Sequence, residues 1–172
     1  MARCSSVWAG VMALALAGAV GTVQAEPPAG YPFVTYEEGV RQAQAEDKPI
    51  FLYFGREGCG WCDKTNKETF SDAALRERYT ENYVLVYVDA ESGRRLTLPT
   101  GERITEMELG VRLRVFATPV FAYLDSQGER LYSAPGFKTV EDFKDIDRYV
   151  RGGHYQHLSL TEFLAAEEAG TL

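Results

Sequence analysis

The clearest indication of the fold is the stretch Pro49–Cys62, which reads P-I-F-L-Y-F-G-R-E-G-C-G-W-C. Its first six residues form an unbroken apolar run, which is typical of a strand that is covered on both faces. Gly55 ends the run, and Cys59 and Cys62 follow, with a helical stretch predicted from about Cys62 to Phe70. The cysteines are therefore predicted to lie where a buried strand ends and a helix begins, which is where sites gather in open α/β sheets.

The segments around this stretch predict alternating helices and strands. Capping residues and helix terminators predict helices at about 35–47, 71–82, 105–113, 139–151 and from 159 onward. Apolar runs predict strands at 83–88, 120–124 and 129–133; residues 90–101 look irregular or hairpin-like, and 152–154 form a turn. The first half needs a right-handed parallel crossover and the second half pairs antiparallel strands. We therefore predict a single α/β domain with a central mixed β-sheet flanked by helices.

The first 25 residues have the pattern of a cleaved signal peptide. Arg3 is followed by the apolar stretch Val7–Val20, and Val23–Ala25 resembles a signal-peptidase site. The apolar stretch is shorter than the roughly 20 residues that a membrane span needs, although an uncleaved anchor is an alternative. We expect residues 26–34 to be a leader and 35–172 the folded domain, located in the periplasm or otherwise secreted.

Composition and charge restrict the classes of partner. The formal net charge is −7 and 45% of the residues are hydrophobic, so the chain has enough apolar material for one core. An acidic chain without a cluster of lysines and arginines argues against binding nucleic acid or anionic lipid through a basic face. We therefore expect no nucleic-acid partner.

The cysteine count points to redox chemistry. Cys4 leaves with the signal peptide, which leaves Cys59 and Cys62 in a C-x-x-C spacing. A bridge between them closes a very short loop and removes little entropy from the unfolded chain, unlike the widely spaced disulfides of small secreted domains. An incidental disulfide is one alternative. A zinc site with His154 and His157, or a Cu(I) site, is another, but we expect no metal because nothing in the sequence brings these segments together.

The C-x-x-C spacing also assigns different roles to the two thiols. At a helix start, unpaired backbone N–H groups and the positive end of the helix dipole stabilise a thiolate. Cys59 is therefore expected to be the exposed nucleophile, and Cys62, one turn into the helix, the resolving thiol. Gly60 permits the tight turn, and Trp61 offers a flat apolar surface on which a substrate chain could lie.

Three segments together resemble the thioredoxin superfamily: Pro49–Phe54, Cys59–Cys62, and Thr118-Pro119 before a strand. Within that superfamily the chain is most similar to exported SoxW-like thioredoxins and to the C-terminal thioredoxin domain of DsbD. The shared pattern includes Phe70-Ser71-Asp72, Val88-Asp89 and Gly136-Phe137. The resemblance covers about residues 31–164 and implies a thioredoxin fold.

The resemblance also implies roles for individual residues. Pro119 matches the family's cis-proline, which packs against the dithiol. The backbone of Thr118 would then be free to pair with a substrate strand, and its hydroxyl could hydrogen-bond a thiolate. Gly136 matches a glycine on the rim of the substrate groove. One position departs from the family: many thioredoxins bury an aspartate where this chain has Tyr53, so the proton of Cys62 must leave through water, through Glu57 or by a slower route.

The function that follows from this resemblance is an exported thiol–disulfide oxidoreductase that reduces disulfides in client proteins. It is expected to be a monomer, to need no cofactor beyond the redox-active Cys59–Cys62 disulfide, and to receive electrons from a membrane thiol donor of the DsbD or CcdA kind. A disulfide-forming oxidase of the DsbA kind is an alternative, although DsbA-like proteins carry a large helical insertion where this chain has only residues 90–101. A non-catalytic metal-binding or client-binding module on the same fold is another.

Overall fold

The computed structural model describes residues 26–172, and the predicted signal peptide lies outside the described residues. The strands are β1 (Ile50–Gly55), β2 (Val84–Asp89), β3 (Arg95–Thr97), β4 (Arg103–Thr105), β5 (Val120–Leu124) and β6 (Arg130–Pro135). The helices are α1 (Tyr36–Glu46), α2 (Gly60–Glu68), α3 (Ala73–Asn82), α4 (Glu106–Arg112), α5 (Val140–Arg151) and α6 (Leu160–Glu168), and a 3₁₀ turn, η1, spans His154–Gln156.

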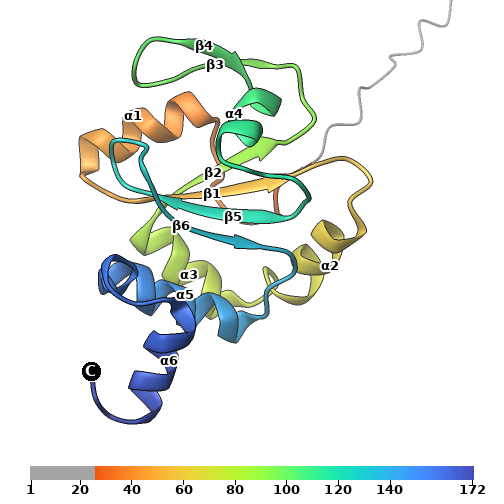
Figure 1. Cartoon of the computed structure of the whole chain (residues 1–172). Helices are drawn as coiled ribbons and strands as arrows, with labels where there is room; N and C mark the ends of the chain where they lie inside the picture. Colours follow the sequence, from red (N-terminus) through yellow and green to blue (C-terminus); the bar gives the residue numbers. More distant parts are fainter. Residues whose placement is uncertain (1–25) are drawn as a thin grey trace, which may run out of the picture.

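The central sheet is mixed, as the sequence predicts. Its strand order is β2-β1-β5-β6; β1 and β2 are parallel, whereas β5 is antiparallel to both β1 and β6. Figure 1 shows α1, α4 and the β3–β4 hairpin on one side of this sheet and α3, α5 and α6 on the other. The arrangement is a thioredoxin fold with the helices on both faces of the sheet.

The alternation of side chains along β1 divides the apolar interior into two cores. Ile50, Leu52 and Phe54 face α1, α4 and the hairpin, while Phe51 and Tyr53 face the opposite layer. Because both faces are covered, every residue of β1 is buried, which explains the unbroken apolar run.

The core on the α3 and α5 side is largely aromatic and contains a polar network. The hydroxyls of Tyr79 and Tyr123 lie 2.8 Å apart, and Tyr83 donates a hydrogen bond of 2.8 Å to the carboxylate of Asp147. Arg78 on α3 also pairs with Asp147, at 2.7 Å. The buried Asp147 is therefore compensated, and it ties α5 to α3.

Residues 26–34, which we expected to be a leader, pack against the domain. Tyr31 is buried in the aromatic core, where its ring lies 5.1 Å from that of Phe70. Val34 exchanges backbone hydrogen bonds with β2, accepting from Tyr87 and donating to Leu85. This single bridge covers part of the outer edge of β2. The bridge and the buried Tyr31 side chain together hold the segment against the domain.

The remaining differences from the predicted elements are small. Residues 90–101 contain the first strand of the β3–β4 hairpin, which is completed by Arg103–Thr105. The predicted turn between the last helices includes Gly153, whose φ is +71°, and continues into η1. Within the described residues, no helix is long and apolar enough to span a membrane.

Candidate functional site

The cysteine pair lies at the carboxyl end of β1, where the chain turns into α2. Gly58, and not Gly60 as we expected, makes the tight turn: its left-handed conformation (φ +66°) brings Cys59 into the N-cap position of α2, and Gly60 is the first residue of the helix. The backbone N–H of Cys62 donates a hydrogen bond of 3.1 Å to Cys59 Sγ. The helix therefore begins at Gly60, two residues earlier than predicted, because a sulfur takes the place of the usual capping oxygen.

The two cysteines are joined in a disulfide, with their Cα atoms 5.2 Å apart. Each residue is only 5% exposed, so Cys59 is not the exposed thiol that we expected. A reacting partner can therefore approach the sulfurs only through a small opening. The N-cap position places Cys59 at the helix N-terminus, which stabilises a thiolate.

Thr118 and Pro119 lie directly beside the dithiol. The antiparallel pairing of Phe54 with Val120 places the residues before β5 next to the end of β1. The Thr118–Pro119 peptide bond is cis. The Thr118 hydroxyl donates a hydrogen bond of 3.2 Å to Cys59 Sγ, so this sulfur accepts hydrogen bonds from both a backbone N–H and a side chain.

Gly136 and Trp61 form the other side of the site. Gly136 has a φ of +77°, and its N–H donates to the carbonyl of Pro119 at 2.8 Å. The next residue, Phe137, lies 6.3 Å from the ring of Trp61, which is 59% exposed. The ammonium of Lys64 lies 5.3 Å from the Trp61 ring and 4.6 Å from the Phe137 ring, within the range of cation–π attraction.

Lys138 holds this side of the site, and the sequence analysis did not identify it. Its ammonium donates to the backbone carbonyls of Pro135 and Phe137, and burial lowers the pKa of Lys138. The Thr69 hydroxyl donates to the carbonyl of Lys138 at 2.6 Å. A lysine that folds back onto carbonyls of its own loop has no sequence motif, so only the structure could reveal it.

Tyr53 occupies the position where the family resemblance leads us to look for an aspartate. It is fully buried, and its hydroxyl donates to Asn66 Oδ1 at 3.2 Å. Burial, with smaller contributions from Tyr87 and Asp63, raises the pKa of Tyr53 far above its ordinary value. The phenol therefore stays neutral at physiological pH and does not accept a proton from Cys62, while Glu57 is exposed to solvent.

The histidines weighed as zinc ligands lie away from the dithiol. His154 is in η1, at the connection between α5 and α6, and its ring packs on Phe163 with a centroid distance of 4.5 Å. Within residues 26–172, no group of three or more histidine, cysteine and acidic side chains is placed to hold a metal ion.

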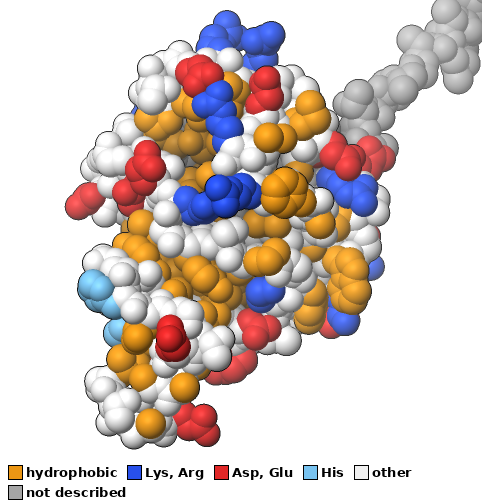
Figure 2. Space-filling view, viewed as in Figure 1, with side chains coloured by type: hydrophobic (Ala, Val, Ile, Leu, Met, Phe, Trp, Pro, Cys, Tyr) orange, Lys and Arg blue, Asp and Glu red, His pale blue; other side chains and the backbone are white. Residues whose placement is uncertain are grey.

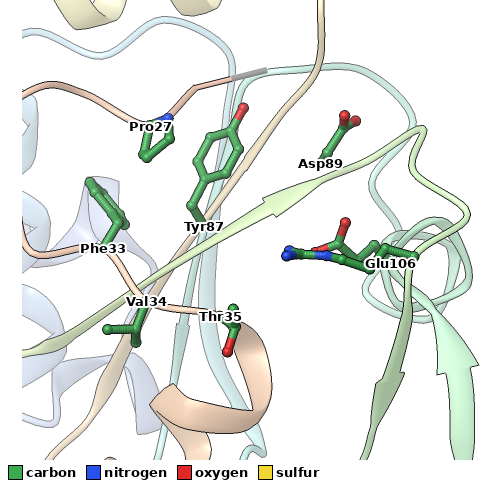
Figure 3. A pocket seen from close by; sticks show the side chains of 8 residues that line it. Pro27, Phe33, Val34, Thr35, Tyr87, Asp89 and Glu106 are labelled. Carbon is green, nitrogen blue, oxygen red and sulfur yellow. The ribbon is translucent and has the colours of Figure 1, made fainter. Parts of the chain in front are cut away.

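A separate recess lies beside the outer edge of β2, and the sequence did not predict it. Figure 3 shows Tyr87 and Asp89 from β2, with Glu106 from α4, around this recess. Glu106 is buried and pairs with Arg94 on the segment before β3, which compensates its charge. No cysteine lines it, so it is distinct from the dithiol site.

A family model described as a thioredoxin-like domain matches residues 36–151. Curated relatives cover less of the chain. Spermatogenesis-associated protein 20 of Rattus norvegicus is 38% identical over 55 residues, which is 32% of this chain and 7% of the relative. An uncharacterized protein of Archaeoglobus fulgidus is 31% identical over 80 residues, covering 46% of this chain and 61% of the relative. The chain thus spans only a small part of the first of these relatives.

Solved structures resemble the fold over most of their own length. A thioredoxin-fold protein from Helicobacter pylori is 25% identical, with a TM-score of 0.59 over 70% of this chain and 82% of that one. A thioredoxin from Thermus thermophilus is 24% identical, with a TM-score of 0.57 over 70% and 86% of the two chains. A putative disulphide isomerase from Bacteroides thetaiotaomicron is 24% identical, with a TM-score of 0.55 over 69% and 89%.

Proposed function

Since this chain belongs to the thioredoxin-like domain family, we propose that it is an exported thiol–disulfide oxidoreductase that reduces disulfides in client proteins. The observation that carries the proposal is the environment of Cys59 Sγ. This sulfur caps α2, accepts hydrogen bonds from the Cys62 N–H and the Thr118 hydroxyl, and is bonded to Cys62 one turn away. Hydrogen bonds to a sulfur favour its charged form and make it a good nucleophile and leaving group.

The reaction exchanges one disulfide for another. The Cys59 thiolate attacks one sulfur of the client disulfide; a mixed disulfide forms, and the other client sulfur leaves as a thiolate. Cys62 then loses its proton and attacks Cys59 Sγ, which forms the Cys59–Cys62 disulfide and releases the second client sulfur. Two electrons pass from the protein to the client, and the two client thiolates take up protons from solvent.

The neutral Tyr53 leaves the proton of Cys62 without a buried carboxylate to accept it. Glu57 is exposed to solvent, so we propose water as the acceptor in the second step. This places the slow step at resolution of the mixed disulfide, not at its formation. A mixed disulfide of appreciable lifetime follows from this arrangement.

We also propose that electrons flow from this protein to its clients. The connection between β2 and β5 contains the β3–β4 hairpin and the short helix α4, where DsbA-like proteins carry a large helical insertion. This favours a reductant that a membrane thiol donor of the DsbD or CcdA kind returns to the dithiol form, as in the SoxW-like thioredoxins. The predicted signal peptide supports the same extracytoplasmic location.

A redox titration tests both the activity and its direction. Trp61 is the only tryptophan in residues 26–172 and lies between Cys59 and Cys62 in the sequence, so its fluorescence can report the fraction of disulfide in glutathione or dithiothreitol buffers. We expect a reduction potential near that of thioredoxin, about −270 mV. A value near that of DsbA, about −120 mV, would instead make the protein an oxidant.

Cysteine variants provide the control for this titration. Cys62→Ser should accumulate mixed disulfides with clients in cells, and Cys59→Ser should accumulate none. Neither variant can form the Cys59–Cys62 disulfide, so both serve as blanks for the titration in dithiothreitol buffers. Absence of any trapped species with Cys62→Ser, at normal expression, would contradict the proposal.

A further inference from the structure

Two of the most exposed apolar side chains, Trp61 and Phe116, are close in sequence to residues of the dithiol site. In the part of the chain that the structure describes, the large apolar side chains most exposed to solvent are Trp61, Met107, Val111, Phe116 and Leu172. Phe116 is 88% exposed, more than any other of this set. The first four come from α2 and from residues 107–116, and we call them the apolar band.

Met107 and Val111 lie on the solvent side of α4. They are four residues apart and therefore point from the same side of the helix. Leu109 and Gly110 are buried against the sheet, so the core does not use the side that Met107 and Val111 share. Figure 2 shows hydrophobic side chains over α4, over the loop that leads into β5, and over α2.

The chain then folds back after α4 and carries Phe116 toward the dithiol. The N–H groups of Arg114 and Val115 donate to the carbonyls of Val111 and Gly110, at 3.0 and 2.8 Å. Phe116 follows one residue later and precedes Thr118 by two, which is at most about 7 Å of extended chain. Since Thr118 donates to Cys59 Sγ, Phe116 lies within reach of any polypeptide whose sulfur contacts Cys59.

A recess beside Phe116 supplies space for a side chain. It is lined by the loop residues 115–118 and, on the other wall, by Arg56, Ala90 and Glu91. Arg56 and Glu91 form an exposed ion pair at 3.5 Å, and exposed pairs of this kind hold together weakly. A bulky apolar group can therefore enter between this pair and the phenyl ring at small cost.

Single exposed apolar residues are ordinary, but a group of them beside a reactive centre marks a binding surface. Trp61 lies between the two cysteines in the sequence, and Phe116 lies two residues before Thr118, whose hydroxyl contacts Cys59 Sγ. Both cysteines are only 5% exposed. Only a narrow, extended segment can bring its own sulfur to Cys59 while its neighbouring side chains lie on both aromatic rings. This geometry fits a locally unfolded polypeptide better than a folded surface or a second copy of this chain.

We propose that the apolar band binds the client polypeptide around its reactive cysteine, and that Phe116 determines specificity. Phe116 contacts a large apolar side chain two or three positions from that cysteine. Clients are therefore proteins whose disulfides lie in extended, apolar segments, as in unfolded or misfolded chains. This inference rests on the proposed oxidoreductase function and adds the substrate class.

Two disulfide-bonded peptides test the inference. They share one sequence, except that leucines at the second and third positions on either side of one cysteine are replaced by serines. With dithiothreitol returning the protein to the dithiol form, and the uncatalysed rate subtracted, we expect the wild-type protein to reduce the leucine peptide with a kcat/KM about tenfold higher than the serine peptide. In Phe116→Ser the ratio of the two kcat/KM values should fall at least fivefold, because KM for the leucine peptide rises. The reduction potential of the protein and its rate of reaction with dithiothreitol should stay unchanged.

The matched control is Leu172→Ser, which removes an exposed apolar side chain outside the apolar band. It should keep the full preference for the leucine peptide. Because Phe116 and Leu172 are both exposed, neither change disturbs the core.

Each other result has a distinct meaning. Equal kcat/KM values for both peptides in the wild-type protein would overturn the client class and leave the oxidoreductase function intact. No reduction of either peptide, and no reaction with dithiothreitol, would overturn both. A wild-type dimer that Phe116→Ser converts to a monomer in sedimentation would identify the apolar band as an interface between copies and overturn the inference.

Discussion

At the scale of single residues, the state of the Cys59 sulfur depends on two hydrogen-bond donors. The Thr118 hydroxyl is the one that a substitution can remove, and Thr118→Val does so with almost no change in shape. We expect the pKa of the Cys59 thiol to rise, since the thiolate loses a hydrogen bond, and a hydrogen bond to a charged group contributes about 1.5–3 kcal/mol. Alkylation of reduced protein by iodoacetamide across pH 4–9 measures this pKa.

Thr118→Ser keeps a hydroxyl and should restore the pKa of the wild-type protein. An unchanged pKa in Thr118→Val would mean that the backbone N–H of Cys62 and the helix N-terminus stabilise the thiolate without the side chain.

The sequence could predict residues whose role comes from spacing. Cys59 and Cys62 follow from the C-x-x-C pattern, and the family resemblance led to Thr118, which the structure places beside Cys59 Sγ. The sequence could not predict Lys138 or Phe116. Their roles depend on which way a loop side chain points, and loop residues lack the periodicity that reveals the buried side of a helix or strand.

At the scale of elements, the Asp147 network joins α3, the start of β2 and α5. Removing the carboxylate in Asp147→Ala leaves Arg78 and the Tyr83 hydroxyl without their partner. We expect a loss of about 2–3 kcal/mol in the free energy of unfolding, measured in urea, because a buried hydroxyl left without a partner costs about 1–3 kcal/mol and the half-exposed Arg78 also loses its ion pair. The reduction potential should not change, because none of these groups touches the dithiol.

Arg148→Ala is the control in the same helix. Arg148 pairs with Glu167 and Asp145 at the surface, so its loss should cost no more than about 1 kcal/mol. Equal losses of unfolding free energy in Asp147→Ala and Arg148→Ala would contradict our argument that burial makes the loss of Asp147 more costly.

Elements were easier to predict than their pairing. The apolar runs and capping pairs indicate the four strands of the central sheet and all of the long helices. The bridge from Val34 to Val86 and the antiparallel register of β3 and β4 depend on contacts between distant segments. Hydrophobic periodicity within one segment contains no information about such contacts, so these features required the structure.

At the scale of the whole molecule, the aromatic core makes stability sensitive to high pH. Burial raises the pKa of Tyr53, Tyr79, Tyr83 and Tyr123 well above the ordinary value of about 10. In the folded protein these phenols keep their protons at a pH where the unfolded chain has lost them. The stabilising difference is fully present below about pH 10 and is lost as pH rises further.

We therefore expect the free energy of unfolding to decrease above pH 10 by about 1.4 kcal/mol per pH unit for each buried phenol. Urea unfolding at pH 8–11, followed together with phenolate absorbance, measures this slope. The phenolate signal of the buried tyrosines should appear in step with unfolding. Gradual ionisation of these four buried phenols near pH 10, in a protein that stays folded, would contradict the expectation.

Helix α6 follows residue 151, where the match to the family model ends, yet it belongs to the core. Phe163 is 1% exposed and packs on Tyr149, whose hydroxyl donates to the carbonyl of Leu158. The segment that must stay together for the core to be complete therefore extends through α6, beyond residue 151, where the match to the family model ends. A gene fusion that joined a new partner at residue 152 would remove Phe163, which packs on Tyr149. A fusion that kept α6 would transfer the domain with its core complete.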